Sequence, residues 1–158
     1  MKTVAAALVL AVAAAAPAAE PRLGVGMECL DRGLWDHAPA IPHLKELGVR
    51  RVRLQSGWAR TEREKGVYDF AWLDRIVDDL VGIGVEPWIS LSYGNPLYAD
   101  PSEGEQDYTG QKMFPMRSAV GEAAWKAYVA AIVHRYRDRV RIWEIWNEPD
   151  VEIGRAHV

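Results

Sequence analysis

The chain has 158 residues, of which 49% are hydrophobic and 26% are charged, and 19 Lys and Arg against 22 Asp and Glu give a formal net charge of −3. This balance is typical of a globular protein and excludes a disordered or collagen-like chain. It also argues against a nucleic-acid partner, because binding through phosphate neutralisation requires a basic surplus. The length allows one domain with a sizeable core.

The first 18 residues have the layout of a secretory signal peptide. Met1-Lys2 is a basic start, residues 3–16 form an apolar run, and Ala16-Pro17-Ala18 supplies small residues before a cleavage point. The run is shorter than the roughly 20 residues that span a bilayer. We therefore predict a signal peptide at 1–18, a secreted or periplasmic protein comprising 19–158, and no stable membrane insertion after cleavage.

Strand and helix patterns alternate in the first half of the remaining chain. Residues 23–28 predict a short strand, apolar residues recur at helical spacing over 41–47, and residues 50–54 predict a second strand. A loop is expected over 55–68. Asp69 is then a candidate N-cap for a helix whose apolar stripe runs from Leu73 to Val81.

The second half repeats this alternation with a longer loop. Residues 86–91 predict a third strand, and residues 92–118 contain several glycines and prolines without a clear period. An apolar stripe over 125–136 predicts a third long helix, and residues 140–146 predict a fourth strand. The βαβαβαβ order implies parallel strands joined by helical crossovers.

Two α/β architectures fit this order: an open doubly wound sheet and part of a (β/α)₈ barrel. The returns from helix to strand are short, whereas the loops that follow strands are long and carry aromatic and polar residues. Chemistry at the carboxyl ends of strands suits both architectures, but the first turn lacks a phosphate-binding glycine pattern. We favour the barrel, and the chain then supplies only the first four β/α units, because a complete barrel needs at least about 200 residues.

Sequence patterns of metal, nucleotide and serine-nucleophile sites are missing from the chain. Cys29 is the only cysteine, and the four histidines form no i, i+4 pair. There is no complete Gly-x-Gly-x-x-Gly, no Walker loop and no Gly-x-Ser-x-Gly. We therefore predict neither a metal nor a cofactor.

The candidate chemistry lies at the end of the fourth predicted strand. Residues 142–149 place Asn147 and Glu148 at the edge of the sheet, and burial beside Trp146 is expected to raise the pKa of Glu148 toward the range of a general acid. Cleavage of a glycosidic bond requires such an acid, and Asn147 is suited to hydrogen-bond a sugar hydroxyl. The alternative is an ordinary strand end, with an exposed glutamate in a turn before Pro149.

Three stretches resemble the clan A retaining glycoside hydrolases, which are (β/α)₈ barrels. Residues 146–149 (Trp-Asn-Glu-Pro) resemble their Asn-Glu-Pro signature. Residues 52–54 with Trp58 and 66–74 resemble their second strand, loop and helix, and residues 89–96 resemble their third strand and loop. The resemblance covers about residues 23–150, and families 5, 39 and 42 of the clan all share parts of the pattern.

The resemblance implies a role for each matching residue. Glu148 corresponds to the acid/base, Asn147 to the contact with the sugar 2-hydroxyl, and Arg53 to a residue near the nucleophile. The alternative for Arg53 is an interior ion pair with Glu144. In the clan the nucleophile is a glutamate at the end of strand seven, beyond this chain. Glu144 cannot replace it, because four strand residues span about 13 Å and retention requires carboxyl groups about 5 Å apart.

Four further residues are candidates for the substrate cleft. Glu28, Trp58, Tyr93 and Asn95 follow predicted strands, and aromatic rings stack well on the C–H faces of sugars. Loop packing or turn formation is the alternative for each of them. We predict an enzyme that hydrolyses O-glycosidic bonds in β-linked glycans with retention, and that is inactive as this fragment alone. The competing hypotheses are a non-catalytic carbohydrate-binding protein and an unrelated α/β protein.

Overall fold

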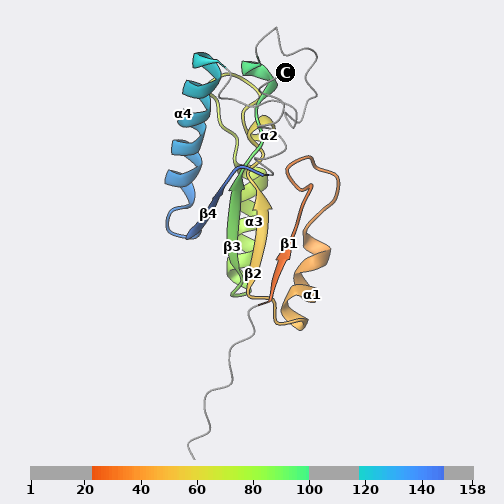
Figure 1. Cartoon of the computed structure of the whole chain (residues 1–158). Helices are drawn as coiled ribbons and strands as arrows, with labels where there is room; N and C mark the ends of the chain where they lie inside the picture. Colours follow the sequence, from red (N-terminus) through yellow and green to blue (C-terminus); the bar gives the residue numbers. More distant parts are fainter. Residues whose placement is uncertain (1–22, 100–117, 148–158) are drawn as a thin grey trace, which may run out of the picture.

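The computed structural model describes residues 23–99 and 118–147, which form one parallel sheet with helices between its strands (Figure 1). The sheet order is β1-β2-β3-β4, so each strand pairs with its neighbours in the chain. The strands are β1 (Gly24–Gly26), β2 (Arg51–Gln55), β3 (Glu86–Leu91) and β4 (Ile142–Ile145). The βαβαβαβ prediction is confirmed, and the predicted signal peptide lies outside the described residues.

Three helices connect the strands, as expected from the apolar periodicity. They are α1 (Ile41–Glu46), α3 (Ala71–Gly82) and α4 (Ala119–Tyr136). The prediction of a continuous loop over 55–68 is wrong, because it contains the single-turn helix α2 (Trp58–Thr61); four residues are too few to show a helical period. Short 3₁₀ turns add η1 (Ala38–Ala40) and η2 (Pro96–Tyr98). No helix within 23–99 and 118–147 is long and apolar enough to cross a membrane.

The ends of the two longer helices are set by short polar side chains. Ser118 caps α4, since its hydroxyl oxygen accepts the Gly121 N–H at 3.0 Å. At α3 the N-cap position belongs to Phe70 and not to Asp69 as predicted. The Asp69 carboxylate still accepts the Ala71 N–H at 3.0 Å, so it satisfies a first-turn donor from one position further out.

The core lies between the sheet and the helices. Alternate strand residues such as Val52, Leu54 and Ile89 are buried against apolar residues of the helices. On the helix side the contributors are Leu73, Ile76, Val77, Leu80, Tyr128, Ile132 and Tyr136. The predicted α3 stripe is one residue too wide, because Val81 is 42% exposed.

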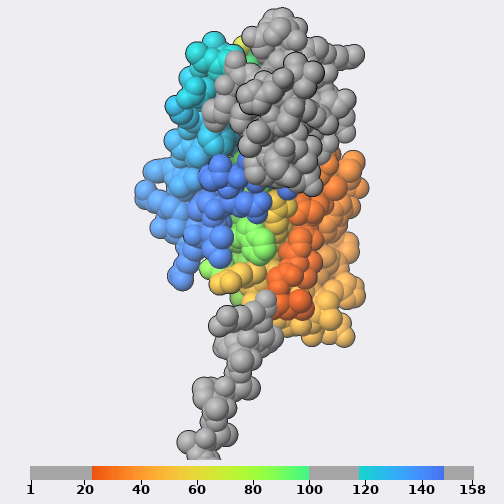
Figure 2. Space-filling view, in the orientation of Figure 1, coloured from red at the N-terminus to blue at the C-terminus, as the bar shows by residue number. Residues whose placement is uncertain are grey.

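The opposite face of the sheet is polar. The residues that alternate with the core positions are Arg51, Arg53 and Gln55 on β2, Glu86, Trp88 and Ser90 on β3, and Glu144 on β4. Figure 2 shows residues of the four strands side by side on the face in view, while α3 lies behind the sheet in Figure 1. Charged and hydrogen-bonding side chains are therefore carried on a face that no described helix covers.

Candidate active site at the carboxyl ends of the strands

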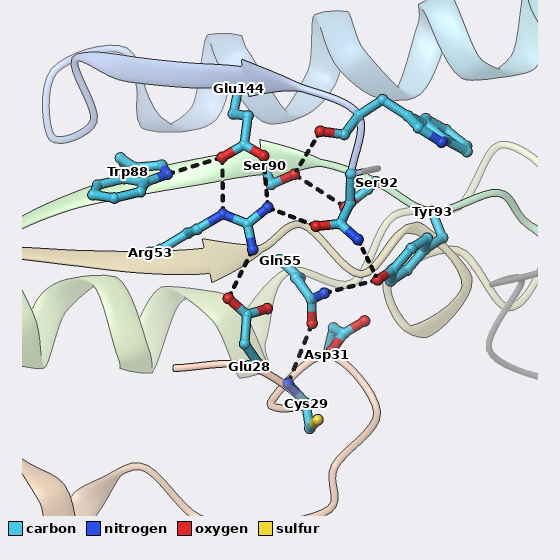
Figure 3. Close-up of polar contacts among 12 residues, drawn as sticks. Glu28, Cys29, Asp31, Arg53, Gln55, Trp88, Ser90, Ser92, Tyr93 and Glu144 are labelled. Atoms are coloured by element: carbon cyan, nitrogen blue, oxygen red, sulfur yellow. Dashed lines mark hydrogen bonds and ion pairs between the residues drawn. The ribbon is translucent and has the colours of Figure 1, made fainter. Parts of the chain in front are cut away.

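Because all four strands are parallel, their carboxyl ends meet at one edge of the sheet. Four side chains from this edge form one hydrogen-bonded cluster: Glu28 after β1, Arg53 on β2, and Glu144 and Asn147 from β4 and the residues after it (Figure 3). The predicted residues Glu28, Arg53 and Asn147 are thus brought together by contacts between segments far apart in the sequence.

Arg53 is the centre of this cluster. Its Nε and Nη2 donate to the two carboxylate oxygens of Glu144 at 2.8 and 2.6 Å, and its Nη1 donates to Glu28 Oε1 at 2.7 Å. Nη2 also donates to the Asn147 side-chain oxygen at 3.0 Å. The Arg53 side chain is only 16% exposed. A planar guanidinium with several fixed donors is the side chain best suited to hold three acceptors at once.

The charges of the cluster favour an ionised Glu144. Hydrogen bonds from Arg53 lower the pKa of Glu144, assisted by the Trp88 indole N–H at 3.1 Å and opposed by partial burial. The hydrogen bonds with Glu144 in turn raise the pKa of Arg53. Of the two roles considered for Arg53, the structure contains the interior ion pair with Glu144.

Tyr93 joins the cluster from the loop after β3. Its hydroxyl oxygen accepts the Asn147 side-chain N–H at 3.1 Å, and its ring packs edge-on against Trp146 with centroids 6.4 Å apart. Asn147 is therefore held from both ends of its carboxamide, by Arg53 and by Tyr93. Glu148 follows Asn147 directly in the sequence and lies outside the described residues.

Sequence reasoning missed Gln55, which is 4% exposed and bonds to three groups. Its side-chain N–H donates to the Tyr93 hydroxyl at 3.1 Å. Its side-chain oxygen accepts from Arg32 Nη2 at 3.0 Å and from the Cys29 backbone N–H at 3.2 Å. The period-2 alternation with Arg53 was the signal that places Gln55 on the polar face.

Trp58 is a core residue, which corrects its predicted place in the cleft. It is 0% exposed, stacks between Tyr98 and Tyr128 with centroids 5.4 and 5.6 Å away, and donates its indole N–H to Glu62. The physical reason is the extra helical turn α2, which directs the ring inward.

Asn95 is corrected in the same way. It is 1% exposed and supports the turn η2, because its side-chain N–H donates to the Glu62 carbonyl at 2.8 Å and its side-chain oxygen accepts the Leu97 N–H at 3.0 Å. Both ends of this carboxamide are used inside the loop. Within 23–99 and 118–147, no group of three His, Cys, Asp or Glu side chains is arranged to hold a metal ion.

Known proteins resemble this chain over most of its length. It is 29% identical over 146 residues to β-galactosidase BgaA of Clostridium cellulovorans, covering 82% of this chain and 22% of BgaA. A solved family 39 glycoside hydrolase from Bacteroides cellulosilyticus WH2 superimposes with a TM-score of 0.62 at 24% identity, covering 80% of this chain and 24% of that one. The β-galactosidase of the psychrophilic Marinomonas ef1 gives a TM-score of 0.64 at 21% identity, covering 81% and 22%.

These comparisons establish fold and family. The solved structures support the fold, so the described residues form about the first four β/α units of a (β/α)₈ barrel, and the chain spans about a fifth to a quarter of the length of these relatives. The sequence model of glycoside hydrolase family 42, described as β-galactosidase, matches residues 31–157. The chain therefore belongs to glycoside hydrolase family 42 and is a partial catalytic domain of a clan A glycoside hydrolase.

Proposed function

We propose that the chain is the N-terminal half of the catalytic barrel of an exported enzyme that hydrolyses β-glycosides with retention of configuration. We call the chain continued through the later barrel strands the complete enzyme. The substrate class follows from the relatives, of which BgaA is a β-galactosidase. Export follows from the predicted signal peptide at 1–18.

The proposed reaction has two steps. In the first, a carboxylate from a later strand attacks the anomeric carbon while Glu148 protonates the departing glycosidic oxygen, which leaves a covalent glycosyl-enzyme and a free alcohol. In the second, Glu148 takes a proton from water, and the water oxygen displaces the enzyme carboxylate from the anomeric carbon. The sugar is released with its original configuration and Glu148 is again protonated.

The observation that carries this proposal is the fixed carboxamide of Asn147 at the end of β4. Its oxygen accepts from Arg53 and one of its N–H groups donates to Tyr93. A side-chain amide has two N–H donors and two acceptor lone pairs, so one of each is left for a sugar hydroxyl. A recognition group held on both sides by neighbouring strands is what positioning a substrate beside an acid requires.

The test is Glu148→Gln in the complete enzyme, assayed on aryl β-galactosides with different leaving groups. We expect kcat/KM for the phenyl glycoside to fall by about 10²–10⁴-fold. The loss for the 2,4-dinitrophenyl glycoside should be much smaller, because that phenolate leaves without protonation. Glu46→Gln, which removes an exposed α1 carboxylate, is the matched control and should leave both rates unchanged.

Two results would contradict the proposal. Equal losses for both leaving groups would mean that Glu148 is not the acid. Binding of β-galactosides by the complete polypeptide without any turnover would instead support a non-catalytic carbohydrate-binding protein.

A further inference from the structure

The Tyr93 hydroxyl lies between two side-chain amides. Gln55 donates to its oxygen from β2 at 3.1 Å, and Asn147 donates to the same oxygen from the end of β4 at 3.1 Å (Figure 3). Gln55 is 4% exposed and Tyr93 is half-buried, so the first of these contacts is shielded from solvent.

The orientation of both amides is fixed by their other partners. The Gln55 oxygen accepts from the Arg32 guanidinium and from the Cys29 backbone N–H, which have no lone pair to offer an amide N–H. The Asn147 oxygen accepts from Arg53, which is also a pure donor. Flipping either amide would set N–H against N–H, so both must present nitrogen to Tyr93.

The direction of the Tyr93 O–H bond follows from these contacts. An amide nitrogen does not accept a hydrogen bond, so neither Gln55 nor Asn147 takes the Tyr93 hydrogen. Tyr93 must therefore act as a donor to a third group. Its ring lies edge-on to Trp146, at the same strand edge as the fixed Asn147 carboxamide.

We propose that Gln55 is a positioning residue that makes Tyr93 a hydrogen-bond donor to a sugar hydroxyl oxygen of the bound substrate. This inference rests on the proposed function. The Gln55 amide keeps the Tyr93 oxygen occupied as an acceptor, so that in the substrate complex the O–H hydrogen is directed to the sugar. A glutamate at position 55 has nearly the same shape, but its carboxylate would accept the Tyr93 hydrogen and withdraw it from the substrate.

The experiment is a double-mutant cycle between Gln55→Glu and Tyr93→Phe in the complete enzyme, with phenyl β-galactoside as substrate. Each single variant should lower kcat/KM by about five- to tenfold, the effect of one neutral hydrogen bond. In the Tyr93→Phe background Gln55→Glu should change kcat/KM by less than about twofold, because no hydroxyl remains to be redirected.

A second arm identifies the acceptor through monodeoxy phenyl β-galactosides. Removing the hydroxyl that accepts from Tyr93 should abolish the effect of both variants, whereas removing any other hydroxyl should leave it. If Gln55→Glu does not fold, as judged by near-UV circular dichroism, Gln55→Met tests the same non-additivity without adding a charge. A smaller loss is expected there, again absent in the Tyr93→Phe background.

Three results would overturn the inference. One is wild-type kcat/KM for Gln55→Glu. Another is a loss of the same size in both backgrounds, which would assign Gln55 to holding the loop at Cys29 and Arg32. The last is an unaffected Tyr93→Phe. If Glu148→Gln still shows its leaving-group dependence in these cases, the proposed function stands and only the role of Gln55 fails; without that dependence the proposed function itself fails.

Discussion

Arg53 and Glu144 form a two-point ion pair although β3 lies between their strands. The Nε–Oε2 and Nη2–Oε1 distances are 2.8 and 2.6 Å, and the two residues are 91 positions apart in the chain. Trp88, the β3 partner of Arg53 in the sheet register, donates its indole N–H to the same Glu144 carboxylate. The pair therefore ties β2 to β4 across the polar face, next to Asn147.

The first prediction concerns what this pair contributes to stability. Arg53→Met would leave Glu28 and Glu144 without their shared cation, and Arg53 is only 16% exposed. We expect the free energy of unfolding, measured by urea titration of the chain at fixed concentration, to fall by about 1–3 kcal/mol. Arg51→Met removes a more exposed pair with Glu86 on the same strand and should cost about 0–1 kcal/mol. Equal costs for the two variants would argue against a special role for Arg53.

The second prediction is a pH dependence carried by Glu144. Its pKa in the folded chain lies below the ordinary value of 4.5, chiefly because of hydrogen bonds from Arg53. A depressed folded pKa adds stability above the unfolded pKa, and that stability is lost as pH falls through the folded pKa. The wild type should therefore exceed Glu144→Gln in urea midpoint at pH 7, and the difference should shrink progressively below about pH 4.5.

The Arg53→Met background is the control for this pH effect. Without the guanidinium the main cause of the lowered pKa is gone, so the pH-dependent difference between Glu144 and its glutamine variant should disappear. A difference that persists unchanged would mean that Trp88 or another group, and not Arg53, stabilises the carboxylate.

The third prediction separates Trp58 from the substrate site. Trp58→Phe keeps the stacked ring but removes the N–H that donates to the buried Glu62 carboxylate. We expect the free energy of unfolding to fall by about 1–3 kcal/mol, with KM for phenyl β-galactoside unchanged in the folded complete enzyme. Tyr93→Phe should show the opposite pattern, with reduced kcat/KM and little loss of stability. A raised KM for Trp58→Phe at unchanged stability would return Trp58 to the cleft.

Repetitive local patterns made the strands and longer helices predictable from the sequence. The strand predicted over 86–91 coincides with β3, and the apolar stripe over 125–136 lies within α4, because a regular period of two or of 3.6 repeats over many residues. Helix α2 escaped detection because it has a single turn. It also explains why Trp58 was misplaced, since one extra turn decides whether a ring after β2 faces the core or the cleft.

The site was predictable only where sequence order fixes geometry. Parallel strands bring their carboxyl ends together, so Glu28, Arg53 and Asn147 were expected at one edge before any contact was known. Which donor meets which acceptor depends on side-chain positions across three strands, as the bonds of Arg53 and Gln55 illustrate. Those partnerships have no local signature, and Gln55 was missed for that reason.

The last prediction is that the chain by itself associates through the β4 side of the sheet. Among the described residues β4 pairs only with β3, and it carries Ile145 at 65% exposure and Ile142 at 36%. An unpaired strand edge with exposed apolar side chains is a template for pairing with another chain. Size-exclusion chromatography with light scattering should show oligomers or aggregates, and Ile145→Lys should shift the population toward monomer. Val120→Lys changes a residue of nearly equal exposure, 64%, at the start of α4 and should leave the association unchanged. A stable monomer in the unmodified chain, or an equal effect of the two lysine variants, would show that the β4 edge does not drive association.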